Sequence, residues 1–331
     1  MTARRLLSIV VPVYNEASNI RAFYDRLMPV LEAAELRAEV IFTDDGSTDG
    51  SFDLIRSLAN GDDRIKCLRF SRNFGSHAAL MAGLRFATGD AAVMIAVDLQ
   101  DPPELIPELV ARWNQGHHVV WAVREGRDDP FLKRLFAAAF YAIFRRIALP
   151  GYPATGMDFG LFDRRVLESL SRFTELNHFI TGMIVWLGFE QARVTYHRRA
   201  RHSGSSKWSF GKRIKNALDA IVSFSYVPVR AISYLGLLIS LASFVFAGFL
   251  LIRALFFRLG SPGWPSVMVT VLFMGGVQLL VLGILGEYIW RGTEQARARP
   301  QYVVRDAIGF ELRAAAAPSD APDEPRVKAT P

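Results

Sequence analysis

The sequence is poor in cysteine, in charge and in the glycine motifs that bind nucleotide phosphates. Cys67 is the only cysteine among 331 residues, which excludes a disulfide framework and a zinc site built from cysteines. No strand-like run is followed by G-x-G-x-x-G and no G-x-x-x-x-G-K-[ST] occurs, so neither a Rossmann dinucleotide site nor a P-loop is supported. Charged residues make up 21% of the chain and hydrophobic residues 51%, which argues against disordered and fibrous proteins and is too apolar for an ordinary soluble enzyme.

Two long uncharged runs lie near the carboxyl end of the sequence. Residues 231–252 and 267–286 contain 22 and 20 consecutive uncharged positions. As helices, each would extend about 30 Å, the thickness of a bilayer core. Two buried helices of a large soluble core are the alternative, which such a close pair of runs disfavours. We therefore expect transmembrane helices at 229–257 and 266–290, with both termini cytoplasmic because basic residues flank the pair.

The positive charge of the chain is concentrated just before the first of these runs. The net charge is +7, but residues 193–230 alone carry +8 and the rest of the chain sums to −1. Apolar residues recur at helical spacing near 209–225, which predicts an amphipathic juxtamembrane helix at 209–228 in the interface of an anionic leaflet. An ordinary domain helix with a solvated face is the alternative. Nucleic-acid binding is disfavoured, because two spans would follow the basic segment directly.

The part of the chain before residue 124 alternates between strand-like and helix-like patterns. Strand-like apolar runs occupy 8–13, 38–43, 65–70, 91–97 and 118–123, and helical patterns lie near 17–35, 49–60, 75–87 and 103–115. This alternation predicts an α/β fold with a mainly parallel sheet covered by helices. Ligands of such sheets bind at the carboxyl ends of the strands, so the residues that follow each strand are the site candidates.

Polar residues follow two of these strands, and a role in capping the next helix would explain some of them. Ser47, Thr48 and Asp49 suit a turn and a cap for the next helix. Asp101 suits an N-cap, with Glu104 completing a capping box.

Capping does not account for the polar residues at the strand ends themselves, which are Asp44, Asp45, Asp98 and Gln100. On extended backbone, Asp98 and Gln100 would point the same way because they are two residues apart. Two oxygen ligands at that spacing can hold Mg²⁺ or Mn²⁺ beside water and a diphosphate. The sequence therefore predicts a divalent metal site after the fourth strand.

Several strings of the sequence resemble family 2 glycosyltransferases with the GT-A fold. They are VVPVYNE, TDDGSTDG, SRNFGSHAALMAGL and VDLQDPPELI. The later strings RRARHSGSSKWS, SFSYVPVR, GGVQLLVLGILGEYIWR and RPQYVV are similar to polyprenyl-phosphate glycosyltransferases, the group of dolichol-phosphate mannose synthases and bactoprenol glucosyltransferases. The resemblance covers residues 6–305. It implies a cytoplasmic GT-A nucleotide-sugar-binding domain at 1–208 and a cytoplasmic tail at 291–331. The end of this tail, from about 314, is rich in alanine, proline and charge, which predicts disorder.

The resemblance also implies roles for individual residues. The nucleotide sugar would contact Pro12, Tyr14, Glu16, Asp44, Asp45, Asp98 and Gln100, and the last two would also bind Mg²⁺ or Mn²⁺. Besides Asp98, the residues predicted to hold the acceptor phosphate or to take part in catalysis are Arg124, Arg127, Asp158, Arg198, Arg201 and Lys207. Asp158 is the candidate acceptor-side catalytic carboxylate, with a turn-forming loop aspartate as the alternative.

The sequence departs from the family pattern at two positions. Ala96 stands where the family usually has the first aspartate of D-x-D-x-Q, which puts donor or metal handling in doubt. Gly160 stands where the family's G-D-F-R-L has arginine.

The implied reaction is an inverting transfer of a sugar from a nucleotide sugar to a polyprenyl phosphate, such as undecaprenyl or dolichyl phosphate. The product would be a lipid-phosphate-linked sugar for later transfer to glycans or lipids. A phosphate is already anionic near pH 7, so no strong general base is required. Two spans favour a bacterial inner-membrane enzyme that uses a UDP-sugar. Glucose, mannose, galactose, N-acetylhexosamine and aminoarabinose derivatives stay open as the sugar, and the resemblance suggests a homotetramer.

Two other functions are weighed against this one. A non-catalytic membrane scaffold derived from such a transferase is kept open by Ala96. A processive polysaccharide synthase of the same fold usually carries Q-x-x-R-W and more spans, and the sequence has neither.

Overall fold

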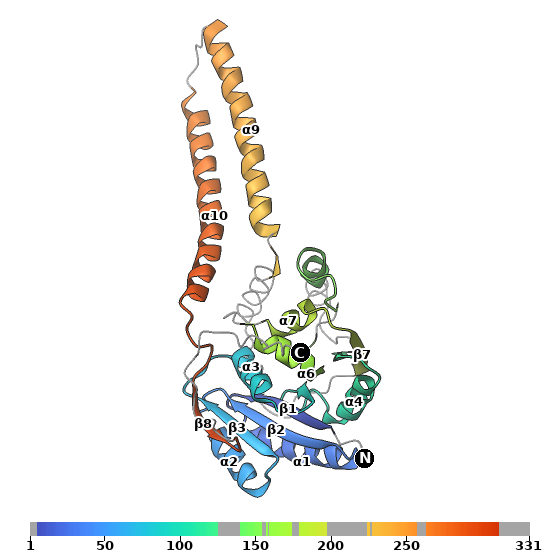
Figure 1. The fold of residues 1–331 in the computed structure, drawn as a ribbon. Coiled ribbons are helices and arrows are strands. Elements are labelled where there is room, and N and C mark those ends of the chain that lie inside the picture. Colours follow the sequence, from blue (N-terminus) through green and yellow to red (C-terminus); the bar gives the residue numbers. More distant parts are fainter. Residues whose placement is uncertain are drawn as a thin grey trace, which may run out of the picture.

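The computed structural model describes residues 5–124, 140–153, 157, 159–173, 179–196, 224–225, 227–256 and 263–310. These residues form an α/β body and two long helices that project from it on one side (Figure 1). The predicted α/β class with a mostly parallel sheet is confirmed. The predicted juxtamembrane helix at 209–228 lies largely outside the described residues.

The body is built on a single sheet of eight described strands. They are β1 (Leu6–Val13), β2 (Arg37–Asp44), β3 (Ile65–Phe70), β4 (Ala91–Met94), β5 (Val119–Arg124), β6 (Phe159–Asp163), β7 (Gln191–Tyr196) and β8 (Val304–Ile308). Their order is β7-β5-β6-β4-β1-β2-β3-β8. β1 pairs in parallel with both β2 and β4, so the strand order reverses at β1, where open α/β sheets bind their ligands. The five predicted strands are confirmed, although β4 is shorter than 91–97.

Helices cover both faces of the sheet. They are α1 (Ala17–Ala33), α2 (Ser51–Gly61), α3 (Ser76–Phe86), the short 3₁₀ helix η1 (Pro103–Leu105), α4 (Ile106–Asn114), α6 (Arg164–Ser171) and α7 (Ile180–Trp186). One core joins Ile9 of β1 to Phe23 of α1, and the core on the other face joins Val10 to Met81 of α3. Burial on both faces explains why the parallel strands are nearly continuous apolar runs in the sequence.

The two projecting helices are α9 (Val227–Phe256) and α10 (Trp264–Ala296). Both predicted apolar runs are therefore helical, and large side chains such as Leu237 and Leu279 are exposed on them. Within the described residues, one stretch, Phe273–Ala296, has the length and apolar character needed to cross a membrane, and a shorter apolar stretch covers Val229–Ile239. Two spans stay a prediction.

After α10 the chain returns to the sheet, where β8 pairs antiparallel with the edge strand β3. The ring of Tyr302 stacks on Phe70 with centroids 5.0 Å apart, and Ser71 N donates to Val303 O at 3.0 Å. β8 thereby covers an open sheet edge and attaches the end of α10 to the body. The sequence prediction placed this strand in a cytoplasmic tail, because its five residues include Arg305 and Asp306 and form no apolar run.

The start of α9 is attached to the same body. The ring of Phe224 packs on Phe179, just before α7, with centroids 6.2 Å apart. The hydroxyl of Tyr288 in α10 donates to Ser225 O at 3.4 Å. The helix pair therefore leaves the body and rejoins it on one side.

Replacement of Tyr302 by alanine should weaken the attachment of β8. Loss of a stacked, largely buried ring should lower the midpoint of thermal unfolding by about 4–8 °C. The matched control is Val303→Ala, because Val303 is 47% exposed in the same segment and should change the midpoint by less than about 2 °C. Equal effects of the two variants would show that β8 does not stabilise the sheet.

Candidate functional site

The loops after β1 and β2 are bonded to each other at the carboxyl edge of the sheet. Asn15 N donates to Ser47 Oγ at 2.9 Å, and Thr48 N donates back to Asn15 Oδ1 at 2.8 Å. Glu16 N donates to Ser51 Oγ at 3.0 Å. Asn15 has a φ of 51°, a left-handed conformation that asparagine tolerates better than most residues. The two loops are therefore joined into one unit by bonds between their own residues.

Asp49 joins the first turns of two helices. Its carboxylate accepts Ala17 N of α1 and Ser51 N of α2, each at 3.1 Å. Partial burial raises the pKa of Asp49, but the bonds from Ser51 and Ala17 outweigh this effect and hold the pKa below its ordinary value. The N-cap residue of α2 is Gly50, which has no side chain that could accept a hydrogen bond. Asp49, one residue earlier, accepts the amide of Ser51 at the start of the helix in its place.

Asp45 fixes the loop after β3. Its two carboxylate oxygens accept Phe74 N at 2.6 Å and Gly75 N at 2.9 Å, at the start of α3. The side chain is 1% exposed, and burial raises its pKa to about 6 against the opposing effect of the two amides. The role seen for Asp45 is to position this loop; its contact with a nucleoside stays a prediction.

Gly46 lets the second and third loops pack backbone against backbone. Its φ is 72°, and a Cβ there would lie 2.6 Å from the carbonyl carbon of Arg72. Both the conformation and the close approach therefore require glycine.

Asp44, the last residue of β2, is fully buried beneath these loops. One carboxylate oxygen accepts Ser47 N at 3.0 Å, and the other lies 3.5 Å from Nε of Arg69. Burial raises its pKa above the ordinary value. Of the residues predicted to contact a nucleoside, Tyr14 is exposed, and Pro12 and Glu16 are partly exposed near the end of β1. Asp44 is 0% exposed, so its side chain is not accessible to a ligand.

The segment after β4 is a turn, so the extended geometry predicted for Asp98 and Gln100 is wrong. Leu99 between them has a φ of 58°, a strained conformation for leucine that costs about 1 kcal/mol. Gln100 N donates to Asp98 Oδ1 at 3.2 Å, and Asp98 is 5% exposed. Strain held by a buried turn is common at functional sites.

The predicted capping roles of Asp101 and Glu104 are also wrong. The N-cap residue of η1 is Pro102, and no side chain caps this helix. The carboxylate of Asp101 instead accepts the hydroxyl of Tyr196, and Glu104 Oε1 accepts Nε of Arg26 at 2.7 Å.

Asp98 and Gln100 fit a divalent cation by their chemistry. Within the described residues, no group of three histidine, cysteine or acidic side chains could hold a metal ion. A buried carboxylate and an amide oxygen in one tight turn match a Mg²⁺ or Mn²⁺ site that takes its remaining ligands from a diphosphate and water. Ala96, at the position of the usual first aspartate, is partly exposed.

The acceptor side of the predicted site is described only in part. Arg124 ends β5 and pairs in register with Tyr196 at the end of β7. The other predicted residues, Arg127, Asp158, Arg198, Arg201 and Lys207, lie outside the described residues. Packing explains why glycine and not arginine stands at position 160, because a Cβ there would lie 2.9 Å from the ring of Trp121.

Three comparisons with known proteins agree with this geometry. Residues 8–170 match the family model described as glycosyl transferase family 2. The chain is 40% identical to an uncharacterized glycosyltransferase of Synechocystis, over 92% of this chain and 96% of that protein. It is also 40% identical to the bactoprenol glucosyl transferase of Shigella phage SfV, over 91% of this chain and 98% of that protein. The fold resembles the mannosyl-3-phosphoglycerate synthase of Rubrobacter xylanophilus, with a TM-score of 0.50 and 19% identity over 70% of this chain and 75% of that one.

Substitution of Gly46 by alanine should separate the packed loops. We expect affinity for a nucleoside diphosphate, measured by titration calorimetry with Mn²⁺, to fall at least about tenfold, because the added methyl collides with the backbone of Arg72. Gly50→Ala is the control: its φ is 86°, but nothing lies within 4 Å of the added carbon. If both variants lose affinity equally, backbone strain and not loop packing controls the site.

The pH dependence of stability should report the burial of Asp45. A pKa raised from 3.8 to about 6 stabilises the folded state fully below pH 3.8, and this stabilisation is lost as the pH rises through 6. The difference amounts to on the order of 3 kcal/mol. Asp45→Asn has no ionisation there, so its stability relative to wild type should rise between pH 4 and pH 7. A constant difference across that range contradicts the assignment.

Proposed function

Because the chain belongs to glycosyl transferase family 2, we propose that it transfers a sugar from a nucleotide sugar to a polyprenyl phosphate in a membrane. The observation that carries the acceptor class is the 40% identity to a bactoprenol glucosyl transferase over 98% of that protein's length. That match extends beyond the α/β body, because it covers 91% of this chain. A UDP-sugar is the proposed donor.

The donor would bind at the joined loops at the carboxyl edge. The exposed Tyr14 directly follows β1 at the start of these loops, and Asp98 and Gln100 follow β4, the adjacent strand. The side chains of Asp98 and Gln100 would hold the divalent cation. When bound, that ion would neutralise charge on the diphosphate leaving group.

The acceptor phosphate would be held by arginine side chains. Arg124 lies at the end of β5, and Arg127, Arg198, Arg201 and Lys207 are proposed to join it, with Asp158 as the acceptor-side carboxylate. A guanidinium binds phosphate through two parallel hydrogen bonds. Since the phosphate oxygen is already anionic near pH 7, these residues would act by positioning the nucleophile and stabilising charge rather than by strong base catalysis.

The attachment of the helix pair supports a membrane hairpin. Phe224 holds the start of α9 and β8 holds the end of α10 on one body, so a pair inserted in a membrane would enter and leave it on the same side. This favours two crossings, with the body and both termini on the cytoplasmic face of a bacterial inner membrane. Exposed apolar side chains along both helices would then contact lipid. A homotetramer stays a prediction.

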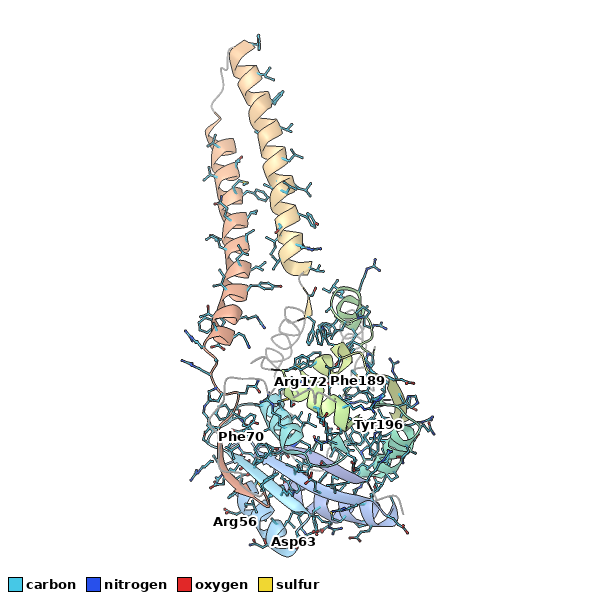
Figure 2. The ribbon with its side chains drawn as sticks, in the orientation of Figure 1. Arg56, Asp63, Phe70, Arg172, Phe189 and Tyr196 are labelled. Atoms are coloured by element: carbon cyan, nitrogen blue, oxygen red, sulfur yellow. The ribbon has the colours of Figure 1, made fainter. Side chains whose placement is uncertain are left out.

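Transfer of labelled sugar to polyprenyl phosphate tests the proposal directly. The full chain in detergent, with Mg²⁺ or Mn²⁺ and a panel of UDP- and GDP-sugars, should yield a lipid-linked sugar. Asp98→Ala should reduce the rate at least about 100-fold, because it removes a proposed metal ligand. Asp63→Ala is the control, since this exposed carboxylate lies at the far end of the body from the helix pair (Figure 2).

Two outcomes would contradict the proposal. Absence of transfer from every donor would favour a membrane scaffold. Equal rates for the Asp98 and Asp63 variants would remove Asp98 from the site.

A further inference from the structure

Tyr196 connects two parts of the sheet that are not neighbours. It is the last residue of β7 (labelled in Figure 2) and is 5% exposed. Its hydroxyl donates to the carboxylate of Asp101. Asp101 follows β4 and is 1% exposed. β5 and β6 lie between β7 and β4 in the sheet, so the contact bridges the strand ends across two strands.

The same hydroxyl also meets an arginine. Arg124, the residue of β5 in register with Tyr196, lies close enough to the phenol to lower its pKa. Burial raises the pKa of Tyr196, the negative charge of Asp101 raises it further, and Arg124 opposes them only in part, so the phenol stays neutral. A neutral phenol donates one bond and accepts another, which lets it join a carboxylate to a guanidinium.

We propose that Tyr196 is a positioning residue that fixes the donor turn at 98–101 relative to the acceptor-phosphate arginines. The inference rests on the proposed function, in which Asp98 and Gln100 serve the donor and Arg124 the acceptor. Asp101 directly follows Gln100 in the donor turn, and Arg198 lies two residues after Tyr196 in the sequence. One hydroxyl therefore holds the two halves of the site at a set separation.

An ordinary core tyrosine looks different in this protein. Tyr152 is 4% exposed, and among the described residues its hydroxyl is bonded to the hydroxyl of Thr181, at 3.2 Å, inside a hydrophobic core. The partners of Tyr196 are both ionisable and both lie at the carboxyl edge of the sheet. Bringing charged groups into a buried network opposes stability unless they are fully paired, so packing alone gives no reason for this arrangement.

The test is whether Tyr196→Phe lowers kcat while it leaves the affinity of the nucleoside loops unchanged. A misplacement near 1 Å can slow a reaction about 100-fold, so we expect kcat to fall about 10- to 100-fold. The dissociation constant of uridine without metal, measured by calorimetry, should change less than about threefold, because the nucleoside loops at β1, β2 and β3 are bonded independently of Tyr196 and uridine has no diphosphate to engage Asp98 and Gln100. Tyr152→Phe is the matched control and should keep kcat within about twofold.

A double variant tests whether Tyr196 acts through Asp101. If it does, Tyr196→Phe combined with Asp101→Ala should be no slower than Asp101→Ala alone. Rate losses that multiply, a kcat of Tyr196→Phe within twofold of wild type, or a uridine affinity that falls in parallel with kcat would each overturn the inference. These outcomes differ from failure of the proposed function, in which the wild-type chain itself transfers no sugar to polyprenyl phosphate and the inference falls with it.

Discussion

The site depends on one buried carboxylate, that of Asp45, which accepts the backbone amides of Phe74 and Gly75. This contact ties the loop after β2 to the start of α3, while Asn15 and Asp49 tie it to the loop after β1. Three loops from three strands therefore hold a common geometry before a substrate arrives. Preorganisation of this kind reduces the ordering that a nucleotide sugar must impose when it binds.

The second feature is the attachment of a hydrophobic helix pair to the body that carries these loops. β8 joins the end of α10 to β3, and Ser71 at that junction directly precedes Arg72, whose backbone packs on Gly46. The segment that follows the helix pair is therefore bonded to the residue at the start of the loop after β3, which is one of the proposed donor loops. This arrangement suits the proposed acceptor, a phosphate anchored in lipid, which a domain without the helix pair would not reach as readily.

Most of the fold could be predicted from the sequence, and the reasons for the exceptions are physical. β1, β2 and β3 are buried on both faces, so their apolar runs identify them. β8 was missed because an edge strand needs no apolar run. The local pattern around Asp101 fits a helix cap, but Tyr196, 95 positions away, is its partner. The candidate residues at strand ends were correctly located on the carboxyl edge, whereas the buried supporting roles of Asp44 and Asp45 depend on contacts that no local pattern contains.

The central claim is that the donor loops are formed before the nucleotide binds, and hydrogen exchange over residues 72–76 of the full chain measures this directly. In the absence of ligand, the amides of Phe74 and Gly75 should exchange slowly, at rates close to those of the sheet, and UDP with Mn²⁺ should change them little. Rapid exchange without ligand, followed by strong protection on addition of UDP, would contradict the account.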